Sequence, residues 1–164
     1  MSKDIRIIIA GGRKFNDYDT FKDCMKKWNK HHRFKEDDKI TVVCGCADGV
    51  DLLGKKYAEE VGWNVELMPA NWNLLGKVAG ILRNNEMAKF ADGGDEKYLI
   101  AVWNGKSKGT KNMIDTAIQH NINIHIFSYD DNEENAVVEY IGDIMDKAFD
   151  IFNDSILKDK KRYF

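Results

Sequence analysis

Short apolar runs alternate along this chain with longer segments of helical spacing. Several of the runs are nearly continuous and rich in β-branched residues, as in Ile7-Ile8-Ile9 and Thr41-Val42-Val43. Such runs are typical of strands that are covered on both faces. The pattern predicts five strands, at Ile5–Ala10, Ile40–Cys44, Asn64–Met68, Tyr98–Trp103 and Ile122–Phe127.

The segments between these runs repeat their apolar residues every three or four positions, which predicts amphipathic helices. Strands that alternate with helices form βαβ units with right-handed crossovers. We therefore predict a Rossmann-like, three-layer α/β domain with a mainly parallel sheet of about five strands. The four helical stripes are Phe21/Cys24/Met25/Trp28, Val50/Leu53/Tyr57/Ala58/Val61, Val78/Ile81/Leu82/Met87 and Met113/Ile114/Ala117/Ile118.

A further apolar stripe follows the last predicted strand, and it predicts an amphipathic helix over 132–158 that packs on the sheet or on a partner subunit. We assign 1–128 to the Rossmann-like domain and 129–164 to a helical extension of the same compact unit. The stripe consists of Val137, Tyr140, Ile141, Ile144, Met145, Ala148, Phe149, Phe152 and Ile156.

Composition narrows the class of protein. The chain has 164 residues, 43% apolar and 32% charged, which suits one soluble domain. A formal net charge of −2 and a pI near 6.1 argue against a general nucleic-acid binder. No apolar run is long enough to span a membrane, and the start of the chain does not resemble a signal peptide, so we expect a cytoplasmic protein without membrane contact.

Three cysteines, Cys24, Cys44 and Cys46, lack the second Cys/His cluster that a zinc site needs. We therefore expect buried, reduced thiols and no metal.

Ligands of open parallel sheets bind beyond the carboxyl ends of the strands, and glycine-rich turns follow each predicted strand except the last. After the first strand, Gly11 and Gly12 permit a sharp turn and a close approach of the backbone to a ligand. Arg13 can then fork onto a phosphate. A simple structural turn is the alternative.

After the second strand, Gly45 and Gly49 flank the start of a helix. Asp48 or Asp51 either caps that helix or binds a ribose hydroxyl. After the third strand, Trp72 either covers a base or closes the loop. Arg83 lies among apolar positions of its helix, so it is either paired internally or directed at the ligand.

The turn after the fourth strand contains Gly105, Lys106, Ser107, Gly109 and Thr110. It has the composition of a P-loop without the order of a Walker motif, which excludes that motif. The two glycines leave the backbone accessible to a ligand, and the hydroxyls of Ser107 and Thr110 can bind phosphate. We place Thr110 at the N-cap of the next helix. Four turns at one edge predict a ligand site.

Taken in order, the motifs from Gly11 to Thr110 resemble the YspA/YpsA-related branch of the SLOG superfamily over about 5–127. They read Gly-Gly-Arg-x-Phe, Gly-x-Ala-x-Gly-Val-Asp, Pro-Ala-x-Trp, Gly-Lys-x-Ala-Gly-x-x-Arg-Asn-x-x-Met and Gly-Lys-Ser-x-Gly-Thr. The resemblance implies a nucleotide-binding Rossmann-like domain and a homodimer or higher homo-oligomer. Relatives include the cytokinin-activating phosphoribohydrolases (LOG enzymes), DprA, and sensor domains of bacterial and phage conflict systems.

The resemblance also implies a test of catalysis. LOG enzymes carry Arg-Lys-x-x-Met on one helix and Gly-Thr-x-x-Glu at the start of the next. Here Arg83 keeps its place, Asn84 replaces the Lys, and Asn112 and Met113 occupy the positions expected for the acid. If the chain is an enzyme, Arg83 and Glu86 are its candidate catalytic residues, with Asp48 or Asp51 as substitutes for the missing acid.

We therefore predict a protein that binds a nucleotide or nucleotide-derived ligand without a cofactor, as a sensor or sequestering protein. The predicted ligand-binding residues are Gly11, Gly12, Arg13, Gly45, Asp48, Gly49, Asp51, Trp72, Arg83, Asn84, Gly105, Lys106, Ser107, Gly109 and Thr110. A LOG-type nucleoside-5′-monophosphate phosphoribohydrolase is the alternative. DprA-like single-strand binding is a weaker one, because the pI is acidic.

Overall fold

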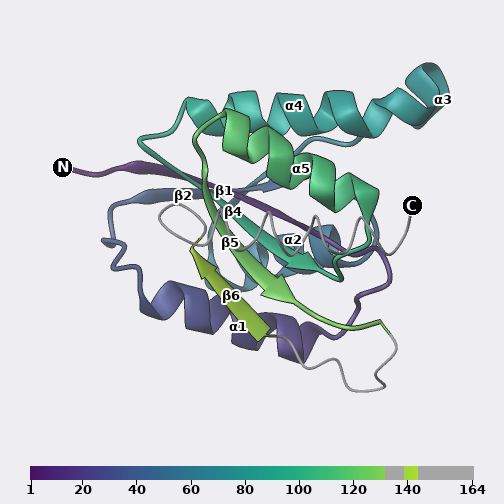
Figure 1. The fold of residues 1–164 in the computed structure, drawn as a ribbon. Coiled ribbons are helices and arrows are strands. Elements are labelled where there is room, and N and C mark those ends of the chain that lie inside the picture. Colours follow the sequence, from purple (N-terminus) through teal and green to yellow (C-terminus); the bar gives the residue numbers. More distant parts are fainter. Residues whose placement is uncertain (132–138, 144–164) are drawn as a thin grey trace.

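A computed structural model describes residues 1–131 and 139–143 of the chain as a sheet with helices on both faces (Figure 1). The strands are β1 (Asp4–Gly11), β2 (Lys39–Cys44), β3 (Asn64–Leu67), β4 (Glu96–Trp103), β5 (Asn123–Ser128) and β6 (Glu139–Asp143). The helices are α1 (Tyr18–Lys30), α2 (Val50–Val61), α3 (Trp72–Leu75), the 3-10 turn η1 (Gly76–Val78), α4 (Ala79–Asp92) and α5 (Lys108–Gln119).

The sheet has the strand order β3-β2-β1-β4-β5-β6. The first five strands are parallel, with Ile7 of β1 opposite Val42 of β2 and Tyr98 of β4. The central strands are buried on both faces, which explains why their sequences read as continuous apolar runs. The prediction of a mainly parallel α/β sheet with five strands in this chain order is confirmed.

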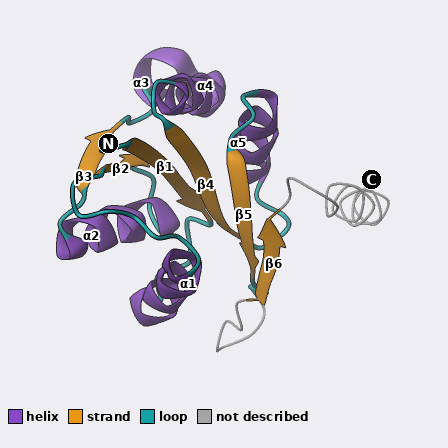
Figure 2. Cartoon of the chain, turned by 90° about the vertical axis from the view of Figure 1, so that its left-hand side faces the viewer, coloured by secondary structure: helices purple, strands orange, loops and turns teal. Residues whose placement is uncertain are grey.

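Two apolar cores lie on opposite faces of the sheet, and Figure 2 shows the helices that cover each face. α1 and α2 cover one face, where Phe21, Met25 and Trp28 of α1 pack against Ile7 and Ile9 of β1. α4 and α5 cover the other face with Met87, Ala88, Ala91, Met113, Ile114 and Ala117. The chain therefore moves from the first face to the second between α2 and α4.

The apolar stripe predicted for α4 is wrong in part. Val78, Ile81 and Leu82 are exposed, and the helix is buried through Ala79, Asn84, Met87, Ala88 and Ala91. The physical reason is that alanines allow a helix to approach a sheet closely, so small residues mark its packed face.

The helix predicted over 132–158 is also wrong where the structure describes this segment. Residues 139–143 form β6, which pairs antiparallel with β5 at the edge of the sheet. The Tyr140 hydroxyl lies 2.9 Å from Nδ1 of His125 on β5. Spacing alone did not distinguish this short strand from a helix, because its residues also fit a helical stripe. Residues 132–138 and 144–164 lie outside the described part of the chain.

No helix within the described ranges, 1–131 and 139–143, combines the length and the apolar character needed to cross a membrane.

Candidate functional site at the carboxyl edge of the sheet

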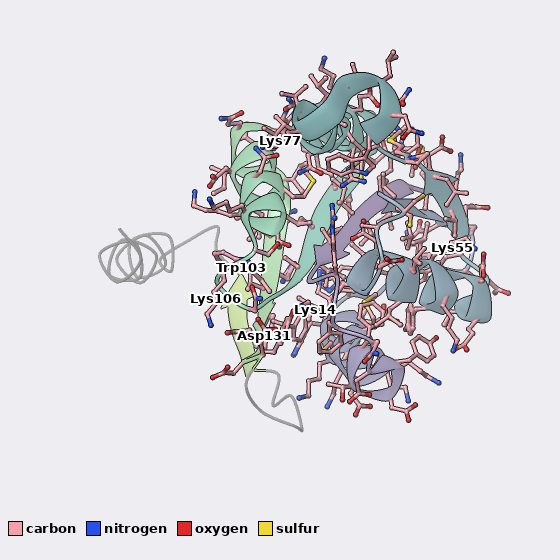
Figure 3. All side chains as sticks on the ribbon, turned by 90° about the vertical axis from the view of Figure 1, so that its right-hand side faces the viewer. Lys14, Lys55, Lys77, Trp103, Lys106 and Asp131 are labelled. Atoms are coloured by element: carbon pink, nitrogen blue, oxygen red, sulfur yellow. The ribbon has the colours of Figure 1, made fainter. Side chains whose placement is uncertain are left out.

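The strand order creates a switch point between β1 and β4. These strands are neighbours, yet β1 continues into α1 on one face and β4 continues into α5 on the other. Their turns therefore diverge and leave a crevice between them, which is where open α/β sheets bind ligands. Figure 3 views the molecule from this carboxyl edge, with Lys14, Lys77, Trp103 and Lys106 around it.

The turns after β1 and β2 are joined to each other. The carbonyl oxygen of Gly12 accepts a hydrogen bond from the backbone N–H of Val50, the first residue of α2, at 3.2 Å. Gly49 has a φ of +82°, and a side chain there would collide with the carbonyl oxygen of Gly12. Glycine is therefore required at Gly49 by both conformation and packing.

The other glycines of these turns also make room for protein groups. The space beside Gly11 is filled by the carbonyl oxygen of Val102, and that beside Gly12 by the hydroxyl of Tyr129. In contrast, beyond the adjoining stretch of chain, no atom of the described residues lies within 4 Å of the side-chain position at Gly105 or Gly109. Among the turns after β1, β2 and β4, the last is thus the one whose glycine backbone is open to a ligand.

Arg83 of α4 is held in a fixed orientation beside the β2 turn. Its Nη1 donates to the carbonyl oxygen of Gly45, and its Nε donates to Oδ1 of Asn84 at 3.1 Å. A Cβ on Gly45 would lie 2.6 Å from that Nη1 and 2.7 Å from Oδ2 of Asp51. Gly45 is therefore the position at which the arginine and the carboxylate approach each other.

Asn84 links α4 to the start of α5. Its Nδ2 donates to Oδ1 of Asn112 at 2.9 Å and to the carbonyl oxygen of Gly109 at 3.3 Å. Asn84 is buried, and Met113 lies in the core. The positions where LOG enzymes carry Lys and Glu are therefore occupied by a neutral amide pair and an apolar side chain.

Asp51 is the buried acid of the site. Only 5% of the residue is exposed, and its Oδ2 accepts from the backbone N–H of Ala47 at 3.2 Å. Burial raises the pKa of Asp51 from 3.8 to about 6, although the positive charges of Arg83 and Arg13 act in the opposite direction. Asp51 does not cap α2, because the N-cap residue is Gly49 and has no side-chain hydrogen bond.

The first turn of α5 presents free donors at the edge. Ser107 is the N-cap residue, and its Oγ accepts from the backbone N–H of Thr110 at 3.4 Å and from Oγ1 of Thr110 at 3.2 Å. The prediction that Thr110 is the cap is therefore wrong: Thr110 is buried in the first turn. Within the described chain, the backbone N–H groups of Lys108 and Gly109 form no hydrogen bond, as is usual for a helix start.

Other predicted residues lie at the rim. Trp72 begins α3, and the guanidinium carbon of Arg13 lies 5.4 Å from the centre of its ring. Asp48 and Glu86 are exposed, and within the described residues neither forms a hydrogen bond or an ion pair. The structure therefore joins Arg83, Asn84, Gly45 and Asp51, but it does not connect Asp48 or Glu86 to them.

Positive charge at this edge is not neutralised by ion pairs. Six side chains, which we call the edge cations, have no carboxylate within ion-pair distance among the described residues: Arg13, Lys14, Lys77, Arg83, Lys106 and Lys108. Two lysines at the opposite edge are ion-paired, Lys3 with Glu96 at 2.6 Å and Lys97 with Asp92 at 2.7 Å. The carboxyl edge is therefore suited to an anion.

Tyr129 is a site residue that the sequence did not indicate. It directly follows β5, its ring packs on Phe15 at 5.0 Å, and its hydroxyl lies against Gly12. Burial raises its pKa to about 12, so the hydroxyl keeps its proton. In the sequence, Tyr129 stands alone before a polar stretch and belongs to no recognisable motif. Only the pairing of β5 with β4 in the sheet could have indicated that it lies at the carboxyl edge.

A separate cavity of about 670 Å³ lies at the opposite, amino edge. It is lined by His32, Phe34, Asp38, Trp63 and neighbouring residues of the α1–β2 and α2–β3 connections. It contains none of the glycine turns and none of the edge cations, so we place the candidate site at the carboxyl edge.

The fold and this edge define a class of protein, a Rossmann-like domain whose strand-end turns converge on a switch point. A model of the YspA, cpYpsA-related SLOG family matches residues 5–74, which include the β1 and β2 turns and Trp72. Gene 61 protein of Mycobacterium phage D29 is 34% identical over 114 residues, covering 66% of this chain and 85% of that protein. The chain belongs to the YspA, cpYpsA-related SLOG family, as its motifs predicted.

Proposed function

We propose that this protein binds a nucleotide or nucleotide-derived ligand at the carboxyl edge of its sheet, as a sensor or sequestering protein. Membership of the SLOG family suggests nucleotide binding or processing in broad terms. The observation that carries the proposal is the set of edge cations around the switch point, because unpaired cations beside free backbone donors favour a phosphorylated ligand.

The phosphate position that these features support lies between Arg83 and the first turn of α5. Two contacts from Arg83, to Gly45 and Asn84, fix the guanidinium without using all of its donors. Asn84 is tied to Gly109, where the helix start is open to solvent. A phosphate placed there meets a fixed arginine and the free N–H groups of Lys108 and Gly109.

Trp72 supports a base-binding role at the rim. It is 46% exposed, which is unusual for so large an aromatic residue, and its ring already has a cation neighbour in Arg13. A purine or pyrimidine stacked on this indole would cover apolar surface that otherwise faces solvent.

Binding without LOG-type hydrolysis is favoured by the amide pair of Asn84 and Asn112, which provides no carboxylate to stabilise an oxocarbenium-like transition state. One observation favours the second candidate function, a nucleotide N-glycosidase. Asp51 has a pKa near 6 and lies beside Arg83, and this pKa suits proton transfer near neutral pH.

The test is to incubate the purified protein with a panel of nucleotides and nucleosides and to record thermal shifts and products by mass spectrometry. We expect nucleotides to raise the melting temperature and to be recovered intact, since a ligand of the folded state stabilises it. Arg83→Ala should weaken the binding of nucleotides by about tenfold or more and leave nucleosides almost unaffected. Arg33→Ala, at the exposed amino edge, is the matched control.

Three results would count against the proposal. Release of free base would favour the N-glycosidase, and its loss in Asp51→Asn would identify the acid. An equal effect of Arg83→Ala on nucleotides and nucleosides would mean that Arg83 is structural. No shift with any phosphorylated compound would contradict the proposal as a whole.

We also propose a homodimer or higher homo-oligomer. Its support is a run of exposed apolar side chains over α3, η1 and the start of α4, which a second copy would cover. Light scattering of the purified protein measures its oligomeric state, and a monomer at all concentrations would contradict the proposed homo-oligomer. The run consists of Leu74, Leu75, Val78, Ile81 and Leu82.

A further inference from the structure

The hydroxyl of Tyr129 belongs to a largely buried side chain at the switch point. The residue is only 7% exposed, and its oxygen lies against Gly12 in the β1 turn. Within the described residues this hydroxyl forms no hydrogen bond, although its atom is not among those completely sealed from solvent. Because solvent reaches this oxygen and no described residue bonds to it, the hydroxyl is available as a donor to a bound ligand.

Neighbouring backbone groups do not provide that partner. The N–H of Gly12 donates to the carbonyl oxygen of Val102 at 3.1 Å, and the carbonyl oxygen of Gly12 accepts from Val50 and Phe15. The next two backbone N–H groups, those of Arg13 and Lys14, form no hydrogen bond in the described chain. The β1 turn therefore presents three donors, one hydroxyl and two N–H groups, and no carboxylate of the described residues is bonded to any of them.

We infer that the Tyr129 hydroxyl is a ligand contact, and that it donates a hydrogen bond to a phosphate oxygen seated on the β1 turn. This inference rests on the proposed function and extends it with a contact on the side of the crevice opposite α5. The phenol remains protonated at neutral pH, because burial raises its pKa to about 12. It therefore acts as a neutral donor at the turn that carries Arg13 and Lys14, which provide the charge.

The chain offers a matched control in Tyr57 of α2. Tyr57 is also buried, and its hydroxyl forms no hydrogen bond within the described residues, but its ring packs between Phe21 and Trp63. Tyr57 is therefore comparable in burial and chemistry and lies away from the β1 turn. Tyr57→Phe should leave ligand binding unchanged.

The experiment uses the full chain with tyrosine labelled at the ring Cζ, titrated with AMP and with inorganic phosphate and followed by NMR. Tyr129→Phe assigns the Tyr129 signal, and calorimetry measures AMP binding to the wild type, Tyr129→Phe, Tyr57→Phe and Arg83→Ala. We expect both probes to move the Tyr129 signal. Tyr129→Phe should weaken AMP binding by about tenfold, as for a hydrogen bond to a charged acceptor, without lowering the melting temperature.

A Tyr129 signal that both probes leave in place at saturation, or an unchanged AMP affinity in Tyr129→Phe, overturns the inference. If Arg83→Ala still weakens AMP binding in that case, the proposed function stands without Tyr129. If phosphate moves the Tyr129 signal but no nucleotide binds more tightly than phosphate, the contact holds and the proposed function fails. Failure of both probes to bind at millimolar concentration also overturns the inference, because the inferred contact is to phosphate itself.

Discussion

Asp51→Asn should stabilise the folded protein at neutral pH. Burial raises the pKa of Asp51 from 3.8 to about 6, so the ionised carboxylate is disfavoured in the folded chain. One pKa unit corresponds to about 1.4 kcal/mol, and the full effect is therefore about 3 kcal/mol. The substitution removes the charge and keeps an oxygen that can accept from the N–H of Ala47.

The sign of the pH dependence follows from the raised pKa. Below about pH 3.8 the carboxyl is protonated in both states, and the favourable contribution of the neutral buried group is complete. As the pH rises toward and through about 6, the unfolded chain releases its proton before the folded chain does, and that contribution is lost. Asp51→Asn should therefore gain stability over the wild type as the pH rises.

Urea unfolding of both proteins from about pH 4.5 to about pH 8 measures this difference. At the upper end, a gain of about 3 kcal/mol corresponds to a rise in melting temperature of roughly 6–12 °C for a domain of this size. Asp48→Asn, three residues earlier and exposed, should remain within about 0.5 kcal/mol of the wild type. A destabilised Asp51→Asn, or a difference that does not vary with pH, would show that burial does not disfavour the ionised form of Asp51.

Three further substitutions separate folding from binding. Gly109→Ala should raise the free energy of unfolding by about 0.5–1 kcal/mol, because alanine favours a helix and no described residue occupies the space of its methyl group. The same methyl group should weaken AMP binding, measured by calorimetry. A gain in both stability and AMP affinity would exclude a phosphate at this turn. Lys106→Gln should leave the melting temperature unchanged and lower the affinity for AMP. The control Lys97→Gln, which breaks the ion pair with Asp92, should leave the affinity for AMP unchanged. The reverse pattern would contradict the role of the edge cations. Gly12→Ala should cost about 1–3 kcal/mol by collision with the Tyr129 hydroxyl. Tyr129→Phe in the same chain should recover part of that loss in urea unfolding, and strictly additive effects would show that the two residues are not in contact.

Four of the parallel strands, β1, β2, β4 and β5, could be predicted from the sequence because they are largely buried and therefore read as nearly continuous apolar runs, whereas β3 is mostly exposed. The face of α4 could not, because alanines pack it against the sheet while larger apolar residues are exposed. Residues 139–143 were misassigned for a related reason: a five-residue edge strand is too short to show its own period.

Within the candidate site, chain order was sufficient to bring the glycine turns to one edge, since parallel strands end together. The sequence did not show what each glycine accommodates. Gly45 makes room for Arg83 and Asp51, and Gly12 for Tyr129, and these contacts join residues that are far apart in the chain. Tyr129 could not be found from the sequence, because its role depends on a neighbour 117 positions away that carries no side chain.

Backbone amide NMR with AMP reports where on the protein a nucleotide binds as well as whether it binds. We predict saturable shifts of Gly12, Arg13, Lys108 and Gly109 at the carboxyl edge, with little change elsewhere. Shifts confined to the residues of the amino-edge cavity, such as Phe34, would contradict the account.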